Sequence, residues 1–147
     1  SYVDHFPTGE ECGDYLAIDF GGSNMRVAHV CLKGNRQFTF EDKKYPIPES
    51  LKTGTRHELF SWIAGNVADY TKTKSGVQFK SLIGVTFSFP MHQWSLNSGK
   101  LLRWNKGFAV PGCVGEDVAV MINEGMQQRG LSFRVGSLVN DTVAVVL

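Results

Sequence analysis

The sequence predicts an α/β domain in which helices cover a mixed sheet of five main strands. Three observations lead to this class. Three apolar or alternating segments follow one another within residues 15–41, which indicates an antiparallel meander. Two segments with helical spacing then alternate with two further apolar strands. Parallel strands need such crossovers, so the later strands join a sheet that mixes both directions.

The first two strands are predicted at residues 15–18 and 25–32, on either side of a glycine turn. Residues 15–18 form a short apolar run that ends at Asp19. Residues 25–32 are apolar at most positions, which is typical of a strand covered on both faces. The acid and the glycine turn therefore share one edge of the sheet.

A third strand and the first helix follow. At residues 38–41, two phenylalanines alternate with polar residues and indicate a half-exposed strand, and residues 43–54, with two prolines, are interpreted as a connecting loop. Thr55 and Glu58 have the spacing of a capping box, which predicts a helix that begins there and packs on the sheet. Its apolar stripe is Leu59, Ile63, Val67 and Tyr70.

The second half repeats the alternation of strand and helix. Residues 81–89 are a strand stopped by Pro90, residues 91–99 are polar and turn-rich, and residues 100–104 are interpreted as a short strand. After a loop at residues 105–115, acids at positions 116 and 117 open a helix with an apolar stripe, and Gly130 closes it. Residues 133–139 are the last main strand.

Composition excludes several classes of function. The chain has 147 residues, 42% hydrophobic and 20% charged, as in one globular domain. The net charge is +1 without a basic block, so nothing indicates nucleic acid. No apolar run predicts a membrane segment, and the N-terminus lacks the order of a signal peptide. Three widely spaced cysteines are interpreted as reduced thiols of a cytoplasmic protein.

The glycine turn, residues 21–24, lies between two strands. A dinucleotide fingerprint or a P-loop places its glycines between a strand and a helix, so neither is present. Two adjacent glycines let backbone N–H groups approach phosphate oxygens closely, and Asp19 beside them suits a phosphate-bound Mg²⁺. Taken alone, the stretch is explained equally well as an ordinary hairpin turn chosen for backbone geometry.

Polar groups recur where strands finish, and we expect them to converge. Ligands of open α/β sheets bind outside the carboxyl ends of the strands. A carboxylate, an amide, a hydroxyl and an ammonium at one place would suit a polyhydroxylated ligand, because each hydroxyl needs a donor and an acceptor. The groups are Asp19 with the glycine turn, Ser88 with residues 105–107, and Asn140 with Asp141.

Three segments, in matching order and spacing, resemble the hexokinase family of eukaryotes. The first resembles its phosphate motif, which actin-like and heat-shock ATPases also carry in related form. The second resembles its sugar-binding signature and the third the segment with its catalytic aspartate, and the combination argues against an ATPase without sugar chemistry. The segments are residues 16–27 (LAIDFGGSNMRV), residues 84–90 (GVTFSFP) with 99–108 (GKLLRWNKGF), and residues 139–143 (VNDTV).

The resemblance implies a ribonuclease H-like (actin-like ATPase) fold, the small lobe of a two-lobed sugar kinase. It also implies phosphorylation of the 6-hydroxyl of glucose or a related hexose by MgATP. Asp141 would accept the hydroxyl proton, and Asp19 would place Mg²⁺ through water. The implied sugar contacts are Ser88, Asn105, Lys106, Asn140 and Asp141, and the implied ATP-phosphate contacts are Asp19, Gly21, Gly22, Ser23, Asn24 and Arg26, the last with bracing of the loop as an alternative.

Two residues depart from the family pattern. Ser23 and Asn105 stand where the family usually has Thr. The serine keeps the hydroxyl, but the longer amide puts sugar affinity or hexose preference in question. Together the two departures motivate an alternative, a non-catalytic hexokinase-like sugar sensor or regulator. We interpret residues 1–13 as a linker from upstream and residues 14–147 as the small domain, truncated after the catalytic aspartate segment. We therefore expect these residues alone to be inactive.

Overall fold

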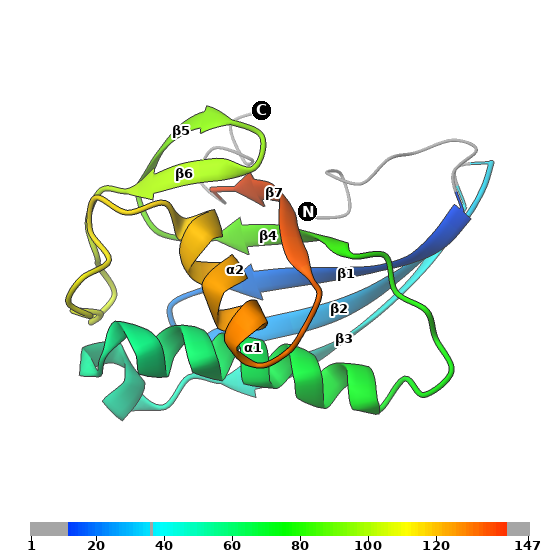
Figure 1. Cartoon of the computed structure of the whole chain (residues 1–147), viewed down its shortest axis with the longest axis horizontal. Coiled ribbons are helices and arrows are strands. Elements are labelled where there is room, and N and C mark those ends of the chain that lie inside the picture. Colours follow the sequence, from blue (N-terminus) through cyan, green and yellow to red (C-terminus); the bar gives the residue numbers. More distant parts are fainter. Residues whose placement is uncertain (1–11, 36, 141–147) are drawn as a thin grey trace.

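The computed structural model of the chain describes residues 12–35 and 37–140. Its main feature is a mixed five-stranded sheet in the order β3-β2-β1-β4-β7 (Figure 1). The strand β1 is antiparallel to β2 and parallel to β4, and β4 is parallel to β7. The predicted fold class is thus confirmed. The strands are β1 (Cys12–Phe20), β2 (Asn24–Lys33), β3 (Phe38–Pro46), β4 (Leu82–Phe87) and β7 (Arg134–Val139).

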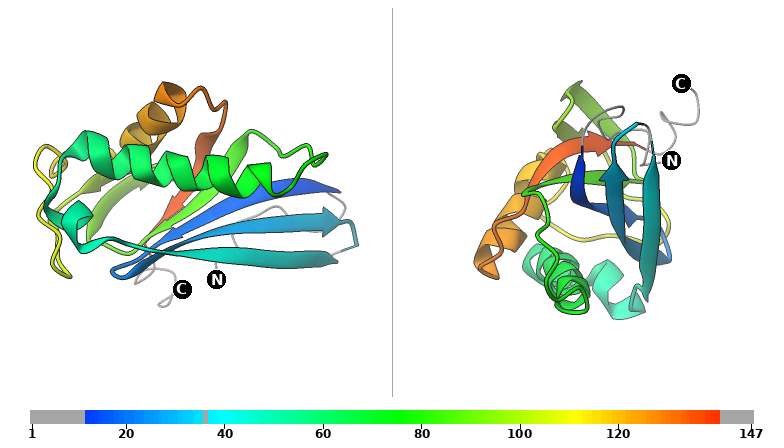
Figure 2. Two further views of the ribbon diagram at one scale, coloured as in Figure 1. Left: turned by 90° about the horizontal axis from the view of Figure 1, so that it is seen from below. Right: turned by 90° about the vertical axis from the view of Figure 1, so that its right-hand side faces the viewer.

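Two helices, α1 (Arg56–Lys72) and α2 (Val118–Gln128), cover one face of the sheet (Figure 2). Their apolar stripes and the inward residues of the strands form one large core. A Cβ on Gly125 would lie 2.6 Å from the carbonyl oxygen of Phe60, so the two helices need glycine at their closest approach. On the other face, a small cluster that includes Ala17 and Val30 is also buried. The strand β2 is therefore covered on both faces, as expected.

The capping box predicted for the first helix is present. Thr55 is the N-cap of α1, and its hydroxyl accepts a hydrogen bond of 3.1 Å from the backbone N–H of Glu58. In return, the Glu58 carboxylate accepts one of 2.9 Å from the backbone N–H of Thr55. These bonds hold the pKa of Glu58 below its usual range. The four residues predicted as the apolar stripe are all buried.

Replacement of Thr55 by Ala should lower the free energy of unfolding by about 1 kcal/mol, because it removes a cap that satisfies orphan N–H groups. Urea denaturation measures this loss. Thr53→Ala, at an exposed threonine nearby, is the matched control and should stay within about 0.5 kcal/mol of wild type. The folded state lowers the pKa of Glu58, so its contribution is present at neutral pH and is lost as the pH falls through that lowered pKa. Equal losses in both variants would contradict the capping role.

The connecting loop predicted at residues 43–54 contains regular structure instead. Residues 43–46 continue β3, in register with β2 from Asn24 opposite Pro46, and residues 49–53 form a short 3-10 helix, η2 (Glu49–Thr53). Proline at a strand end is compatible with pairing because its missing N–H is not needed there. The third strand also differs from the half-exposed prediction, because neither of its faces is buried. Phe38 and Phe40 are 49% and 43% exposed, and the polar residues that alternate with them are exposed as well.

A second hairpin occupies the stretch predicted as polar and turn-rich. It consists of β5 (Met91–Ser95) and β6 (Ser98–Leu101), so the short strand expected at residues 100–104 begins and ends earlier. The hairpin is held over β7, because the backbone N–H of Leu138 donates to the carbonyl of Leu96 at 2.8 Å. The side-chain amide of Gln93 also donates to the carbonyl of Leu138.

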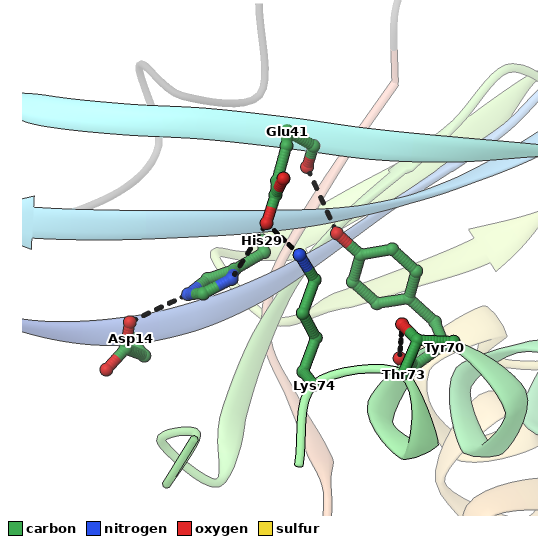
Figure 3. A network of polar contacts seen from close by, with 6 residues as sticks. All are labelled: Asp14, His29, Glu41, Tyr70, Thr73 and Lys74. Atoms are coloured by element: carbon green, nitrogen blue, oxygen red, sulfur yellow. Dashed lines mark hydrogen bonds and ion pairs between the residues drawn. The ribbon is translucent and has the colours of Figure 1, made fainter. Parts of the chain in front are cut away.

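A polar network links three strands and α1 at the end of the sheet away from the glycine turn (Figure 3). The Nε2 atom of His29 lies 2.7 Å from Oδ1 of Asp14, and its Nδ1 atom lies 3.7 Å from Oε1 of Glu41. Glu41 also forms an ion pair with Lys74, and its carbonyl oxygen accepts from the hydroxyl of Tyr70. The network joins β1, β2 and β3 to the end of α1, so its role is structural and it lies far from the glycine turn.

No helix within residues 12–35 and 37–140 has the length and apolarity that a membrane crossing requires.

Candidate functional site

The parallel strands β1, β4 and β7 bring three polar segments to one edge of the sheet (Figure 1). The backbone N–H of Ser88 donates to the carbonyl oxygen of Phe20 at 3.0 Å, which ties the end of β4 to the end of β1. Asn140 follows β7 directly and is 6% exposed. Ser88 and Asn140 therefore lie at the ends of neighbouring strands, with Ser88 tied to the end of β1.

The glycine turn closes a tight hairpin between β1 and β2. The backbone N–H of Gly21 donates to the carbonyl of Asn24 at 3.0 Å, and that of Ile47 donates to the carbonyl of Ser23 at 2.9 Å. Neither Gly21 nor Gly22 has a positive φ, so the backbone conformation itself does not require glycine. Space does require it at one position, because a Cβ on Gly22 would lie 2.7 Å from Cδ of Lys106.

A pocket of about 460 Å³ opens beside this hairpin. Its wall includes the four described residues predicted to contact a sugar, although they come from three distant segments of the chain. Asp141, the predicted base, lies outside the described residues. The lining residues are Ser88, Phe89, Pro90, Met91, Leu102, Arg103, Asn105, Lys106 and Asn140.

Lys106 is the side chain that joins the pocket to the glycine hairpin. Its backbone is left-handed, with φ of 57°, which is uncommon for a residue other than glycine. Its Nζ atom donates to the carbonyl oxygen of Ser88 at 2.8 Å and lies 5.2 Å from the ring centroid of Phe89. The turn is closed by Phe108, whose N–H donates to the carbonyl of Asn105 at 3.0 Å. The ammonium group is thus held at the pocket wall by its backbone and by its partners.

Five aromatic rings, which we call the aromatic cluster, pack behind the pocket. Phe89 is 1% exposed, and its centroid lies 5.0 Å from those of both Trp104 and Phe108. The indole N–H of Trp104 donates to the carbonyl of Val110 at 2.9 Å, so its polar atom is satisfied. Each ring comes from the end of β1 or β4 or from the loop of the second motif. The members are Phe20, Phe87, Phe89, Trp104 and Phe108.

Asn140 is fixed by the same cluster. Its amide group is buried and donates to the carbonyl oxygen of Phe89. Arg103 is a pocket residue that sequence reasoning missed, although it directly precedes Trp104 in the second motif. With Lys106 it gives the pocket two cationic side chains.

Asp19 and Arg26 lie opposite each other on β1 and β2, at the base of the glycine hairpin. Arg26 forms an ion pair of 3.5 Å with Asp42 on β3, which agrees better with bracing the hairpin than with reaching into the pocket. Asp19 is half-buried beside Thr86. Within residues 12–35 and 37–140, no three His, Cys, Asp or Glu residues gather as metal ligands. One carboxylate with phosphate oxygens and water still suits Mg²⁺, which keeps several waters.

The loop that carries Lys106 is anchored at several points to the rest of the domain. Ala109 donates from its backbone N–H to the carbonyl of Lys52 at 2.8 Å, and Gly115 donates to that of Leu101 at 2.7 Å. The guanidinium group of Arg56 donates to the carbonyl of Gly112 at 3.0 Å. Cys113 in this loop is fully buried, and burial raises the pKa of its thiol to about 11.

The thiol of Cys113 should therefore react slowly while the loop is in place. Only the thiolate reacts, so the raised pKa leaves less of the reactive form at neutral pH, and burial restricts access to it. Mass spectrometry after brief alkylation should find Cys12, which is exposed, labelled well before Cys113. In urea the two should label at similar rates. Equal labelling in the native protein would show that this loop is not anchored as described.

Comparisons with known proteins agree with the geometry. A family model described as Hexokinase matches residues 1–147. The hexokinase of Schwanniomyces occidentalis is 40% identical over 99% of this chain, and hexokinase-1 of Oryza sativa subsp. japonica is 42% identical over the same share. The chain spans 31% of the length of each. A structure of hexokinase from Schistosoma mansoni complexed with glucose superposes with a TM-score of 0.84 at 37% identity, covering 95% of this chain and 32% of that one.

Proposed function

The chain belongs to the hexokinase family, and on that basis we propose that its full-length protein phosphorylates glucose or a related hexose at the 6-hydroxyl, with MgATP as donor. One observation carries the proposal: Ser88, Asn105, Lys106 and Asn140 line one pocket, and Lys106 touches the glycine hairpin. A sugar in that pocket would lie next to phosphates at the hairpin. The S. mansoni protein to which the chain is similar was solved with glucose.

The proposed roles follow the chemistry of phosphoryl transfer. Its transition state is loose, so catalysis depends on alignment and on stabilisation of charge. Backbone N–H groups at Gly21 and Gly22 would bind the β- and γ-phosphates, with Ser23 and Asn24 completing the hairpin. Asp19 would hold Mg²⁺ through water, and the metal when bound neutralises phosphate charge. Asp141 would accept the proton of the sugar hydroxyl as the new P–O bond forms.

The pocket would select a sugar through its hydroxyl groups. The hydroxyl of Ser88, the amides of Asn105 and Asn140 and the ammonium of Lys106 supply donors, and the first three also supply acceptors. A ligand that fills these contacts would stabilise closure of the lobes and exclude water, which limits wasteful hydrolysis of ATP. Because Asn105 carries two donors where a hydroxyl is usual in the family, we expect it to influence which hexose is preferred.

The test is release of ADP by the full-length protein, measured with and without glucose. We expect release that depends on glucose and yields equimolar hexose 6-phosphate. Glucose binding without ADP release would favour the sensor, which the Asn105 departure motivates. Absence of glucose binding would contradict both functions.

We also propose a cytoplasmic location, since three widely spaced cysteines are typical of reduced thiols.

A further inference from the structure

We propose that Gly22 is a positioning residue for the sugar as well as a phosphate contact, because its bare backbone provides the space in which the side chain of Lys106 lies. This inference rests on the proposed function for the identity of the ligand, a hexose. Gly22 would then affect sugar affinity even when no nucleotide is bound.

The first support is the contact itself. A Cβ placed on Gly22 would meet three atoms of the Lys106 side chain, Cδ at 2.7 Å, Cβ at 3.3 Å and Cγ at 3.4 Å. The shortest of these contacts is with Cδ, in the middle of the lysine side chain, and the other two are with Cβ and Cγ near the backbone. A Cβ placed on Gly21 would meet only the carbonyl oxygen of Asn24, at 3.6 Å, which is an ordinary contact. The two adjacent glycines thus differ in what they make room for.

The second support is that the side chain of Lys106, although exposed, is held at both ends. Its φ of 57° fixes the direction of Cβ from a sparsely populated backbone conformation, and such conformations persist where the surroundings hold them. At the other end, Nζ is held by the carbonyl oxygen of Ser88 at 2.8 Å. A methyl group at position 22 would push the stem between two fixed ends. The ammonium group would then lose its hydrogen bond to the carbonyl oxygen of Ser88 and move away from the pocket wall.

One consequence is that the hairpin and the sugar pocket behave as a single unit. A ligand that orders Lys106 also fixes one wall of the hairpin, and phosphates that order the hairpin fix the stem of Lys106. Such coupling is reciprocal in binding free energy. Hexose should therefore tighten nucleotide binding, and Gly22 is the point at which the two sites touch.

The experiment measures glucose affinity of the full-length protein without nucleotide, by isothermal titration calorimetry. Gly22→Ala should raise the Kd for glucose about tenfold, as expected when one hydrogen-bonding group is misplaced. Gly21→Ala, the matched control on the same hairpin, should keep the Kd within about twofold whatever it does to nucleotide. Unchanged glucose affinity in Gly22→Ala would overturn the inference, as would equal losses in both variants.

A second experiment tests the contact between Gly22 and Lys106 even if Gly22→Ala folds poorly or the protein binds no glucose. Gly22→Ala should lower the Tm, and addition of Lys106→Ala, which removes the stem beyond Cβ, should restore most of that loss. The double variant should also bind glucose no more weakly than Lys106→Ala alone. A Tm that Lys106→Ala does not restore would overturn the inference. Wild-type protein that binds no glucose would instead refute the proposed function, and the Tm arm would still decide whether Gly22 accommodates Lys106.

Discussion

Replacement of Asp141 by Ala in the full-length protein should lower the rate of hexose phosphorylation by roughly 10²–10⁴, the contribution usual for a positioned base. The sugar hydroxyl is a poor acid, and its proton must leave as the bond to phosphorus forms. The preceding residue, Asn140, lines the pocket, and its buried amide donates to the carbonyl oxygen of Phe89. Steady-state assays with saturating MgATP measure kcat directly.

Glucose binding should persist in Asp141→Ala, because Ser88, Lys106 and Asn140 remain in place. The control is Asp69→Ala, which removes an exposed aspartate that pairs with Lys43 on the helical side of the domain. It should change kcat less than about twofold. Near-normal turnover in Asp141→Ala would end the assignment of this residue as the base.

The second large effect is expected on stability. Phe89→Ala should lower the free energy of unfolding by about 3–5 kcal/mol, the usual cost of removing a large buried ring and leaving a cavity. Phe89 is 1% exposed and contacts the rings of Phe20, Phe87, Trp104 and Phe108. Chemical denaturation followed by circular dichroism measures the change.

The control for Phe89 is Phe38→Ala on the edge strand β3. Phe38 is 49% exposed, so its removal should cost less than about 1 kcal/mol. Phe89→Ala should also weaken glucose binding in whatever fraction stays folded, because the ammonium group of Lys106 lies over the ring that is removed. Equal costs for the two phenylalanines would show that the aromatic cluster does not carry the stability assigned to it.

Much of the fold could be predicted from the sequence because its signals are local. The capping box of Thr55 and the four-residue spacing that follows it determine where α1 begins and which side is buried. The continuation of β3 to Pro46 and the β5–β6 hairpin were not predictable in this way. Both depend on pairing with residues distant in the chain, such as Asn24 opposite Pro46 and Leu138 against Leu96.

For the candidate site too, features with a local signal could be predicted from the sequence, and features that depend on the path of the chain could not. Residue types at strand ends predicted a set of polar groups, of which Ser88, Asn105, Lys106 and Asn140 line one pocket. Arg103 and the contact between Gly22 and Lys106 could not be predicted, because they depend on the path of the loop that follows Trp104. The side chain of Lys106 reaches the hairpin only because its backbone is left-handed, which no local pattern in the sequence indicates.

The most direct test of the account is a crystal structure of the full-length protein with glucose bound. The account predicts that the sugar lies against Ser88, Lys106 and Asn140, with a carboxylate oxygen of Asp141 about 2.6–3.2 Å from the 6-hydroxyl oxygen. The same hydroxyl should face the glycine hairpin at Gly21 and Gly22. A sugar seated elsewhere, or an Asp141 carboxylate directed away from the 6-hydroxyl, would contradict the proposed mechanism.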